Sequence, residues 1–238
     1  MSYRTITIDG DLVKTPSGLV RLPSIYLVVH PNRSGRIIVN YPGRGGKING
    51  YNQKHTRLAN HLQEQGVGAV IRMENPSLGN GYYPLVLLEN LRSVVRYCLT
   101  EAEGICGTRE PQIGLMGTSA GGAAVLAVGS EFPEVDKILA LNASGDARRE
   151  DIERGLRAFR GDLYIAAGTE DELISPKTSE YYHSLATAAR SRRFALIPGC
   201  DHQFKGERNG RIFSHATLWA FAGDESFPDP EKGIWLYD

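Results

Sequence analysis

The chain has 238 residues, 41% hydrophobic and 23% charged, with a formal net charge of zero. This size and balance suit a single α/β domain over residues 1–238, and they exclude a disordered chain or a strongly basic nucleic-acid-binding protein. The N-terminus lacks a charged-then-apolar signal segment and no apolar run approaches membrane length, so we expect no membrane partner. Because the net charge is zero, we also expect no nucleic-acid partner. Scattered cysteines (Cys98, Cys106 and Cys200) favour a cytoplasmic protein without metal or cofactor.

Hydrophobic periodicity predicts strands that alternate with helices along most of the chain. In chain order we expect strands at 3–8 and 21–29, a strand at 36–41, a helix at 52–65, a strand at 69–73, a helix at 84–102, a strand at 112–116, a helix at 120–128, strands at 137–143, 163–167 and 194–197, and helices at 176–189 and 211–222. The first two strands form an antiparallel edge hairpin in this prediction. The remainder predicts a mostly parallel, doubly wound sheet with helices on both faces.

A serine at a strand-to-helix junction is the first candidate for chemistry. Residues 115–122 read Leu-Met-Gly-Thr-Ser-Ala-Gly-Gly, which centres Ser119 in a G-x-S-x-G pentapeptide. Such a turn presents the hydroxyl as a nucleophile, and Gly117 and Gly121 avoid collisions as the chain reverses. The pattern alone is weak in a glycine-rich chain, since Ser119 can also be an ordinary small residue, so its partners matter.

An acid and a histidine follow the serine, each just after a predicted strand. Asp171 lies three residues after Gly168, between Glu170 and Glu172, which remain alternatives for the same role. Asp171 can also be a plain helix N-terminal acid. His202 follows the strand at 194–197. Because open α/β sheets place their sites at the carboxyl ends of strands, we expect the three side chains to meet there.

The other histidines are less suited to the role of a general base. They are His30, His55, His61, His183 and His215. His55, His61 and His183 fall in polar helical stretches, which predicts solvated side chains. His30 precedes a proline at a strand end, and His215 belongs to the last predicted helix. Only His202 lies on a loop after both a strand and the acid.

The order serine, acid, histidine resembles that of α/β-hydrolase-fold serine hydrolases of the esterase or thioesterase kind. The segments 117–121, 168–176 and 198–204 carry the resemblance, and the matching order of elements spans about residues 20–222. It implies a Ser119–His202–Asp171 triad and an oxyanion hole formed by backbone N–H groups. One donor is expected from Ala120.

The second oxyanion donor is expected from the loop at 40–46, Asn-Tyr-Pro-Gly-Arg-Gly-Gly. Where many lipases and esterases have His-Gly-Gly-Gly, this chain has Pro-Gly-Arg-Gly, so the resemblance points to the Arg44 N–H. The Arg44 side chain either points into solvent or attracts an anionic substrate.

Two further segments have alternative interpretations. Residues 146–161 replace the large cap of many relatives and hold one short helix, either a crossover packed on the sheet or a mobile lid. Their interleaved arginines and acids predict a solvated face. The tail at 223–238 ends in Ile-Trp-Leu-Tyr-Asp, which favours docking on the body over a partner contact.

The sequence therefore predicts a serine hydrolase that cleaves a small-molecule carboxylic ester or thioester through an acyl-enzyme. A peptidase or acyltransferase with the same triad is the alternative, followed by a non-catalytic binding module. A thiol enzyme based on Cys200 is remote, because Cys200 is beside the histidine and not at the elbow. The oligomeric state is left open by the sequence.

Overall fold

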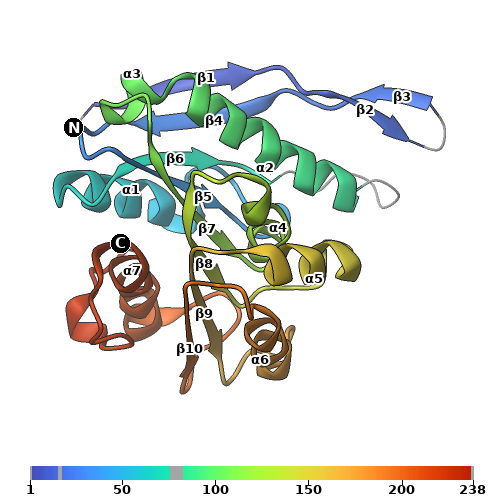
Figure 1. The fold of residues 1–238 in the computed structure, drawn as a ribbon. Helices are drawn as coiled ribbons and strands as arrows, with labels where there is room; N and C mark the ends of the chain where they lie inside the picture. The colour runs from blue at the N-terminus through green and yellow to red at the C-terminus, as the bar shows by residue number, and fades with distance from the viewer. Residues whose placement is uncertain (1, 16–17, 76–82, 237–238) are drawn as a thin grey trace.

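The computed structural model describes residues 2–15, 18–75 and 83–236, and an eight-stranded sheet runs through the molecule (Figure 1). In spatial order its strands are β1 (Arg4–Ile8), β4 (Ile25–His30), β6 (Ala69–Met73), β5 (Arg36–Tyr41), β7 (Gln112–Thr118), β8 (Val135–Leu141), β9 (Asp162–Gly168) and β10 (Ser191–Ile197). Strand β4 is antiparallel to both β1 and β6. The pairs from β6 to β10 are parallel.

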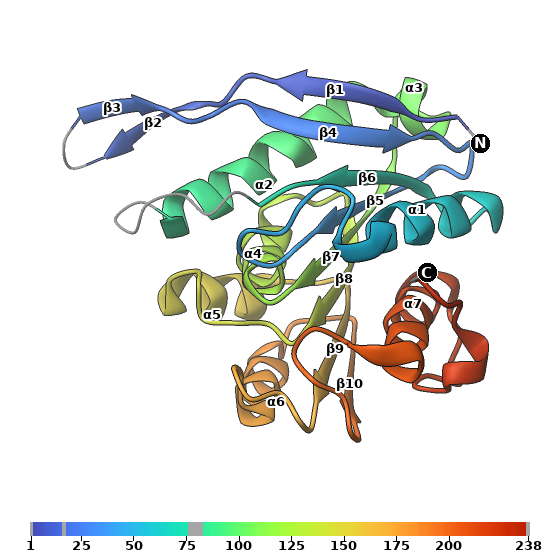
Figure 2. The ribbon, with the colours of Figure 1, turned by 180° about the vertical axis from the view of Figure 1, so that it is seen from behind.

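Helices cover both faces of this sheet. They are α1 (Lys54–Glu64), α2 (Tyr83–Thr100), α3 (Ala102–Cys106), α4 (Ala120–Val128), α5 (Arg149–Ala158), α6 (Pro176–Leu185) and α7 (Gly206–Ala222), with 3-10 turns at Tyr51–Gln53, Gly129–Glu131 and Pro230–Lys232. Figure 2 shows α1 and α7 together on one face, while α2, α4, α5 and α6 lie on the other. This is the α/β architecture that the alternating elements predicted.

The strands are apolar almost throughout because each side chain meets a helix layer. In β5, Ile37 and Val39 belong to the core beneath α2 and α4, whereas Ile38 between them belongs to the core beneath α1 and α7. Successive strand residues point to opposite faces, so a strand covered on both sides needs a continuous apolar run. The two cores share no residue and meet only through the sheet.

The predicted element order is confirmed, with local corrections, and the helix expected at 176–189 ends at Leu185. The expected strand at 21–29 starts only at Ile25, and a second sheet, β2 (Leu12–Thr15) paired with β3 (Gly18–Arg21), lies before it. Both strands are only four residues long; β3 is exposed throughout and β2 is buried only at alternate positions, so neither has the longer apolar run that predicted the other strands. The last helix begins at Gly206 and not at Arg211. The hydrophobic pattern did not reveal its first turn, because that turn is polar and mostly exposed.

The segment at 146–161 forms a crossover helix and the tail lies against the body. In α5, Ile152 is buried and Gly155 packs so closely on α4 that a Cβ there would lie 2.3 Å from the Leu126 carbonyl oxygen. In the tail, Phe227 stacks on the Trp219 ring at 4.5 Å and Leu236 is fully buried. Tyr237 lies outside the described residues. In the part of the chain that the structure describes, no helix combines the length and apolar character needed to cross a bilayer.

The expectation that His55, His61 and His183 are solvated is wrong for His55 and only partly right for the others. His55 is 4% exposed, and His61 and His183 are half-buried. The reason is that Gly50 bends the chain so that α1 turns His55 inward: a Cβ on Gly50 would lie 2.9 Å from the His55 ring. His30 is also buried and accepts a hydrogen bond from Arg72 Nε through Nε2 at 3.0 Å.

These two buried histidines should make folding sensitive to acid. Burial, aided by the Arg72 charge, lowers the pKa of His30 to about 4, and burial lowers that of His55 to about 3. An unfolded histidine binds its proton near pH 6.5, so the unfolded chain holds more protons below that pH. The contribution of these two histidines to the free energy of unfolding is therefore fully present above about pH 6.5. It is lost as the pH falls towards the folded-state pKa values of about 4 and 3, by up to about 1.4 kcal/mol per pH unit for each histidine.

Urea unfolding at pH 7 and pH 5 measures this effect. The free energy of unfolding should fall less between these pH values in a His55→Leu variant than in the wild type. Equal falls in the two proteins would contradict the assignment of acid sensitivity to His55.

Candidate active site

Ser119 lies at a sharp turn between β7 and α4. Its backbone has φ 51° and ψ −118°, a strained conformation for a residue with a side chain, which costs on the order of 1–3 kcal/mol. The flanking glycines permit the turn. A Cβ on Gly117 would lie 2.2 Å from the Gly121 carbonyl oxygen, and one on Gly121 would lie 2.0 Å from that of Tyr41. The geometry is that of a nucleophile elbow, with the serine half-exposed at the apex.

Asp171 and His202 form a direct hydrogen bond. Asp171 Oδ2 lies 2.7 Å from His202 Nδ1, and the carboxylate side chain is only 1% exposed. The other carboxylate oxygen accepts the N–H groups of Leu173 and Ile174 at 2.9 and 2.8 Å. By contrast, the neighbouring acids Glu170 and Glu172 are exposed. The geometry thus favours Asp171 among the three acids, because its carboxylate is fixed in direction on the imidazole.

The loops that carry the acid and the histidine are bonded along their length. Thr169 N–H donates to the Ile197 carbonyl, and Glu170 N–H donates to the Cys200 carbonyl, both at 3.0 Å. Gly168 is required here because a Cβ would lie 2.1 Å from the Cys200 carbonyl oxygen. The close approach brings the two loops into register, which is why residues 31 positions apart can meet.

Asn142, which the sequence analysis did not single out, joins this loop pair to the serine strand. It follows β8 with φ 45° and is buried. Its side-chain oxygen accepts the Gly168 N–H at 2.9 Å, while its amide nitrogen donates to the carbonyl oxygens of Asp201 and His202 at 3.2 and 3.1 Å. The Ser119 N–H donates to the carbonyl oxygen of Leu141, the residue before Asn142, at 3.0 Å. Asn142 therefore fixes the histidine backbone relative to the elbow.

The expected triad is only partly formed. Within the described residues, Ser119 Oγ makes no hydrogen bond to His202, whereas the histidine and the acid are joined. Catalytic hydrogen bonds often tighten only when a substrate is bound. The structure thus brings the second and third members together and leaves the first link open.

The loop after β5 lies against Ser119 and is held by Asn75. A Cβ on Gly43 would lie 3.2 Å from Ser119 Cβ. Asn75, 1% exposed, exchanges backbone hydrogen bonds with Gly45 and Gly46 at 2.8 and 2.9 Å. Its side-chain amide donates to the Pro42 carbonyl at 3.0 Å and accepts the Tyr83 hydroxyl at 3.1 Å. No motif marks Asn75 in the sequence, because its role depends on two segments meeting in space.

The Arg44 side chain is exposed, as one of the two expectations for it had it, but it also contacts two neighbouring groups. Its guanidinium lies over the Tyr83 ring, 4.2 Å from the centroid, and Arg44 Nη1 lies 3.8 Å from Asp146 Oδ1. Asp146 in turn accepts the Ser144 hydroxyl at 2.6 Å. These contacts connect the loop at 42–46 to the turn after β8.

Asn75→Ala should slow catalysis without a matching loss of substrate binding. The substitution frees the Pro42 carbonyl from its amide donor and leaves only the backbone bonds of residue 75, so the loop beside Ser119 is held less firmly. A displacement of about 1 Å in a catalytic group costs on the order of 100-fold. We expect kcat for a p-nitrophenyl ester to fall about 10- to 100-fold while KM changes little.

Tyr83→Phe is the matched control for that variant, because it removes only the hydroxyl bond to Asn75 and keeps the ring beneath Arg44. Its kcat should fall less. An Asn75→Ala protein that is folded and retains kcat within about twofold would refute the positioning role.

Cys200 is unsuited to a role as nucleophile. It is fully buried, and burial together with the neighbouring Asp201 raises the pKa of its thiol to about 12. A thiolate is the reactive form, so this thiol is inert near neutral pH. Across residues 2–15, 18–75 and 83–236, no three His, Cys, Asp or Glu side chains gather as ligands of a metal ion.

Solved structures with the same arrangement include several hydrolases. The chain is similar to the esterase domain of a Rhodothermus marinus protein, with a TM-score of 0.66 and 18% identity over 93% of this chain and 100% of that one. It is similar to dienelactone hydrolase from Anabaena variabilis, at 0.67 and 16% over 92% and 99%. An alpha-beta serine hydrolase homologue from Coxiella burnetii gives 0.60 and 18% over 89% and 94%. No protein-family model and no curated protein sequence matches the chain.

Similarity to solved structures at these sequence identities shows the fold alone. The chain has the α/β-hydrolase fold, as its sequence predicted, with the antiparallel second strand and the parallel remainder in the expected places.

Proposed function

We propose that this protein is a serine hydrolase that cleaves a small-molecule carboxylic ester or thioester through an acyl-enzyme. The observation that carries the proposal is the 2.7 Å hydrogen bond between His202 and a buried Asp171, formed on loops that Asn142 ties to the elbow of Ser119. The fold neighbours whose names denote esterases and a dienelactone hydrolase support ester chemistry. The three free, buried thiols are consistent with a reducing cytoplasm as the expected location.

In this mechanism each residue has one task. Ser119 Oγ attacks the carbonyl carbon while His202 Nε2 takes its proton, and Asp171 holds the imidazole through Nδ1 and stabilises the imidazolium. The tetrahedral intermediate collapses, the alcohol or thiol leaves with the proton from His202, and the acyl group stays on Ser119. Water, deprotonated by His202, then attacks the acyl-enzyme and releases the acid.

The negative oxygen of each tetrahedral intermediate needs fixed donors. We assign them to the backbone N–H of Ala120, the first residue of α4, and to that of Arg44, which follows the glycine packed on Ser119. Ala120 also lies at the positive end of the helix dipole. Loss of one such donor typically costs about 2.7–4 kcal/mol in the transition state.

The direct test combines covalent labelling with a substrate panel. A fluorophosphonate probe should label Ser119, and p-nitrophenyl esters of rising chain length should be hydrolysed, as should matched thioesters. Faster cleavage of aminopeptidase substrates, or acyl transfer to an added alcohol in preference to water, would replace the esterase assignment with one of the alternatives on the same triad. Absence of both labelling and turnover in folded protein would indicate a binding module.

A further inference from the structure

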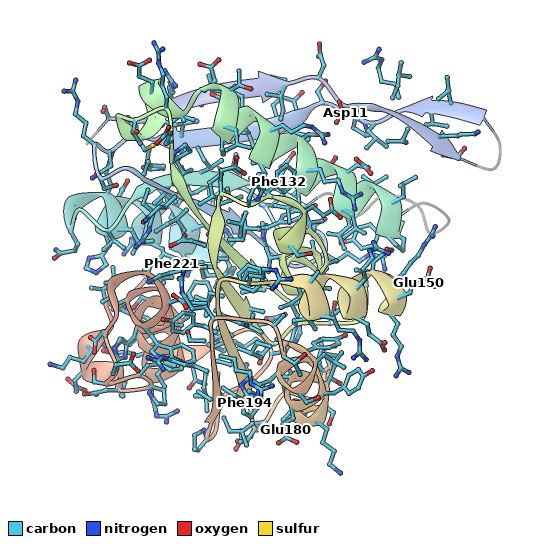
Figure 3. The ribbon with its side chains drawn as sticks, viewed as in Figure 1. Asp11, Phe132, Glu150, Glu180, Phe194 and Phe221 are labelled. Atoms are coloured by element: carbon cyan, nitrogen blue, oxygen red, sulfur yellow. The ribbon has the colours of Figure 1, made fainter. Side chains whose placement is uncertain are left out.

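A surface hollow of about 460 Å³ lies between the starts of α5 and α6. It is lined by Gly145, Ala147, Arg149, Lys177, Thr178, Tyr181 and Tyr182. In Figure 3, Glu150 marks the first turn of α5 and Glu180 marks α6, the two helices that border the hollow; neither of these acids belongs to the lining. The lining thus combines two tyrosine rings, small apolar groups and two cationic side chains.

The hollow adjoins the nucleophile through one peptide unit. Ser144 N–H donates to the Ser119 carbonyl at 3.1 Å, and the next residue, Gly145, lines the hollow. On the far side, the Tyr182 hydroxyl donates to the Ser144 carbonyl at 3.1 Å. Residues along a chain are at most about 3.8 Å apart between Cα atoms, so the hollow begins close to the elbow.

The two cations of the lining differ in what they already bind. Arg149 Nε donates to Glu153 at 2.6 Å, a carboxylate that also lies 3.9 Å from Arg157 Nη2, and Arg149 Nη2 donates to the Tyr181 hydroxyl at 3.0 Å. For Lys177, no carboxylate of the described residues lies within 4.0 Å of the ammonium group. Of the two cations of the lining, Lys177 is therefore the one without a carboxylate at ion-pair distance among the described residues.

We propose that this hollow binds a carboxylate-bearing part of the substrate, with an aryl or short alkyl body against Tyr181 and Tyr182 and a single carboxylate at Lys177. The inference rests on the proposed ester hydrolysis and adds its substrate class. The area between the tyrosines takes an apolar group, and one unmatched ammonium takes one negative charge. Aliphatic esters without charge would use the same nucleophile but gain nothing from Lys177.

The first test compares anionic esters with neutral esters of the same shape. One pair carries the charge in the acyl half, namely the p-nitrophenyl monoester of glutaric acid and its methyl ester. The other carries it in the phenol half, namely 4-acetoxybenzoate and its methyl ester. The ratio of kcat/KM, anionic over neutral, should fall about fivefold in Lys177→Gln for at least one pair, the upper range for an exposed ion pair. The difference in this ratio between the wild type and Lys177→Gln should shrink at 0.5 M salt, because the Debye length there is only a few Å.

Lys14→Gln is the matched control, because it removes the same charge from the exposed face of β2, remote from α6 (Figure 1). Its ratio should equal that of the wild type. An unchanged ratio in Lys177→Gln for both pairs would overturn the proposed subsite.

Gly145→Leu tests the hollow by filling it. No atom lies within 4 Å of the position that a Cβ would take at Gly145, and its φ is not in the left-handed region, so the backbone there accepts a side chain without a clash at Cβ. The ratio of kcat/KM for the glutarate monoester to that for p-nitrophenyl acetate should fall at least tenfold. A ratio that stays within twofold of the wild type would show that substrates do not enter the hollow.

Failure of the subsite and failure of the proposed function give different results. Ser119 labelling and hydrolysis of neutral esters, with no effect of Lys177→Gln or Gly145→Leu, would leave the hydrolase and remove the subsite. If no ester is cleaved, binding decides alone: NMR titration with phenylacetate should show saturable binding to the wild type and at least threefold weaker binding to Lys177→Gln. Equal binding, or none, would overturn the subsite in that case too.

Discussion

Ser119→Ala is expected to abolish both ester hydrolysis and covalent labelling by a fluorophosphonate probe. The methyl group has no oxygen to attack a carbonyl, so no acyl-enzyme can form. The fold should survive, because alanine tolerates the elbow no worse than serine and the flanking contacts come from Gly117 and Gly121. In serine hydrolases, removal of the nucleophile typically reduces kcat by about 10⁶.

Two variants accompany this measurement. Ser130→Ala replaces a half-buried serine in the 3-10 turn after α4 and should retain wild-type labelling and turnover. Ser119→Ala combined with His202→Ala should be no slower than Ser119→Ala alone, because the two residues act as a unit and their effects do not add. Residual labelling of folded Ser119→Ala at the wild-type rate would place the nucleophile elsewhere.

The parts of the site that follow strands could be predicted from the sequence. Ser119 is flanked by the glycines that its turn requires, and Asp171 and His202 each follow an apolar run, so their meeting follows from the parallel sheet. Order along the chain sufficed because the carboxyl ends of neighbouring strands converge. The spacing of Asp171 after Gly168 favoured it over Glu170 and Glu172 but did not exclude them. Burial of Asp171 and its contact with His202 favour the same acid.

The supporting residues could not be predicted in this way. Asn75 and Asn142 are polar, buried and isolated in the sequence, and their hydrogen bonds reach segments that are tens of residues away. A lone asparagine after a strand is indistinguishable from a loop residue until the tertiary structure shows which backbone groups it satisfies. The same limit explains His55, whose burial depends on how α1 packs and not on the polarity of its neighbours.

Asp171→Asn should reduce turnover by about 10⁴, whereas Glu170→Gln and Glu172→Gln should have mild effects. The amide keeps an oxygen for the N–H groups of Leu173 and Ile174, so the loop retains its shape. However, an NH₂ group facing Nδ1 of His202 favours the tautomer with its proton on Nε2, which cannot accept the proton of Ser119. In serine protease triads the corresponding change costs on the order of 10⁴ in kcat.

The three acids occupy consecutive positions, so the comparison tests their geometry with almost no change in composition. All three substitutions remove one negative charge from the same loop, and a purely long-range effect of charge would make them similar. Only Asp171 is buried on the imidazole; Glu170 and Glu172 are exposed and screened by solvent. Turnover should therefore separate Asp171→Asn from the other two by at least a thousandfold, measured on a p-nitrophenyl ester with folding checked by circular dichroism. If either glutamine variant were as slow as Asp171→Asn, the acid would be misassigned, although Ser119 could still be the nucleophile.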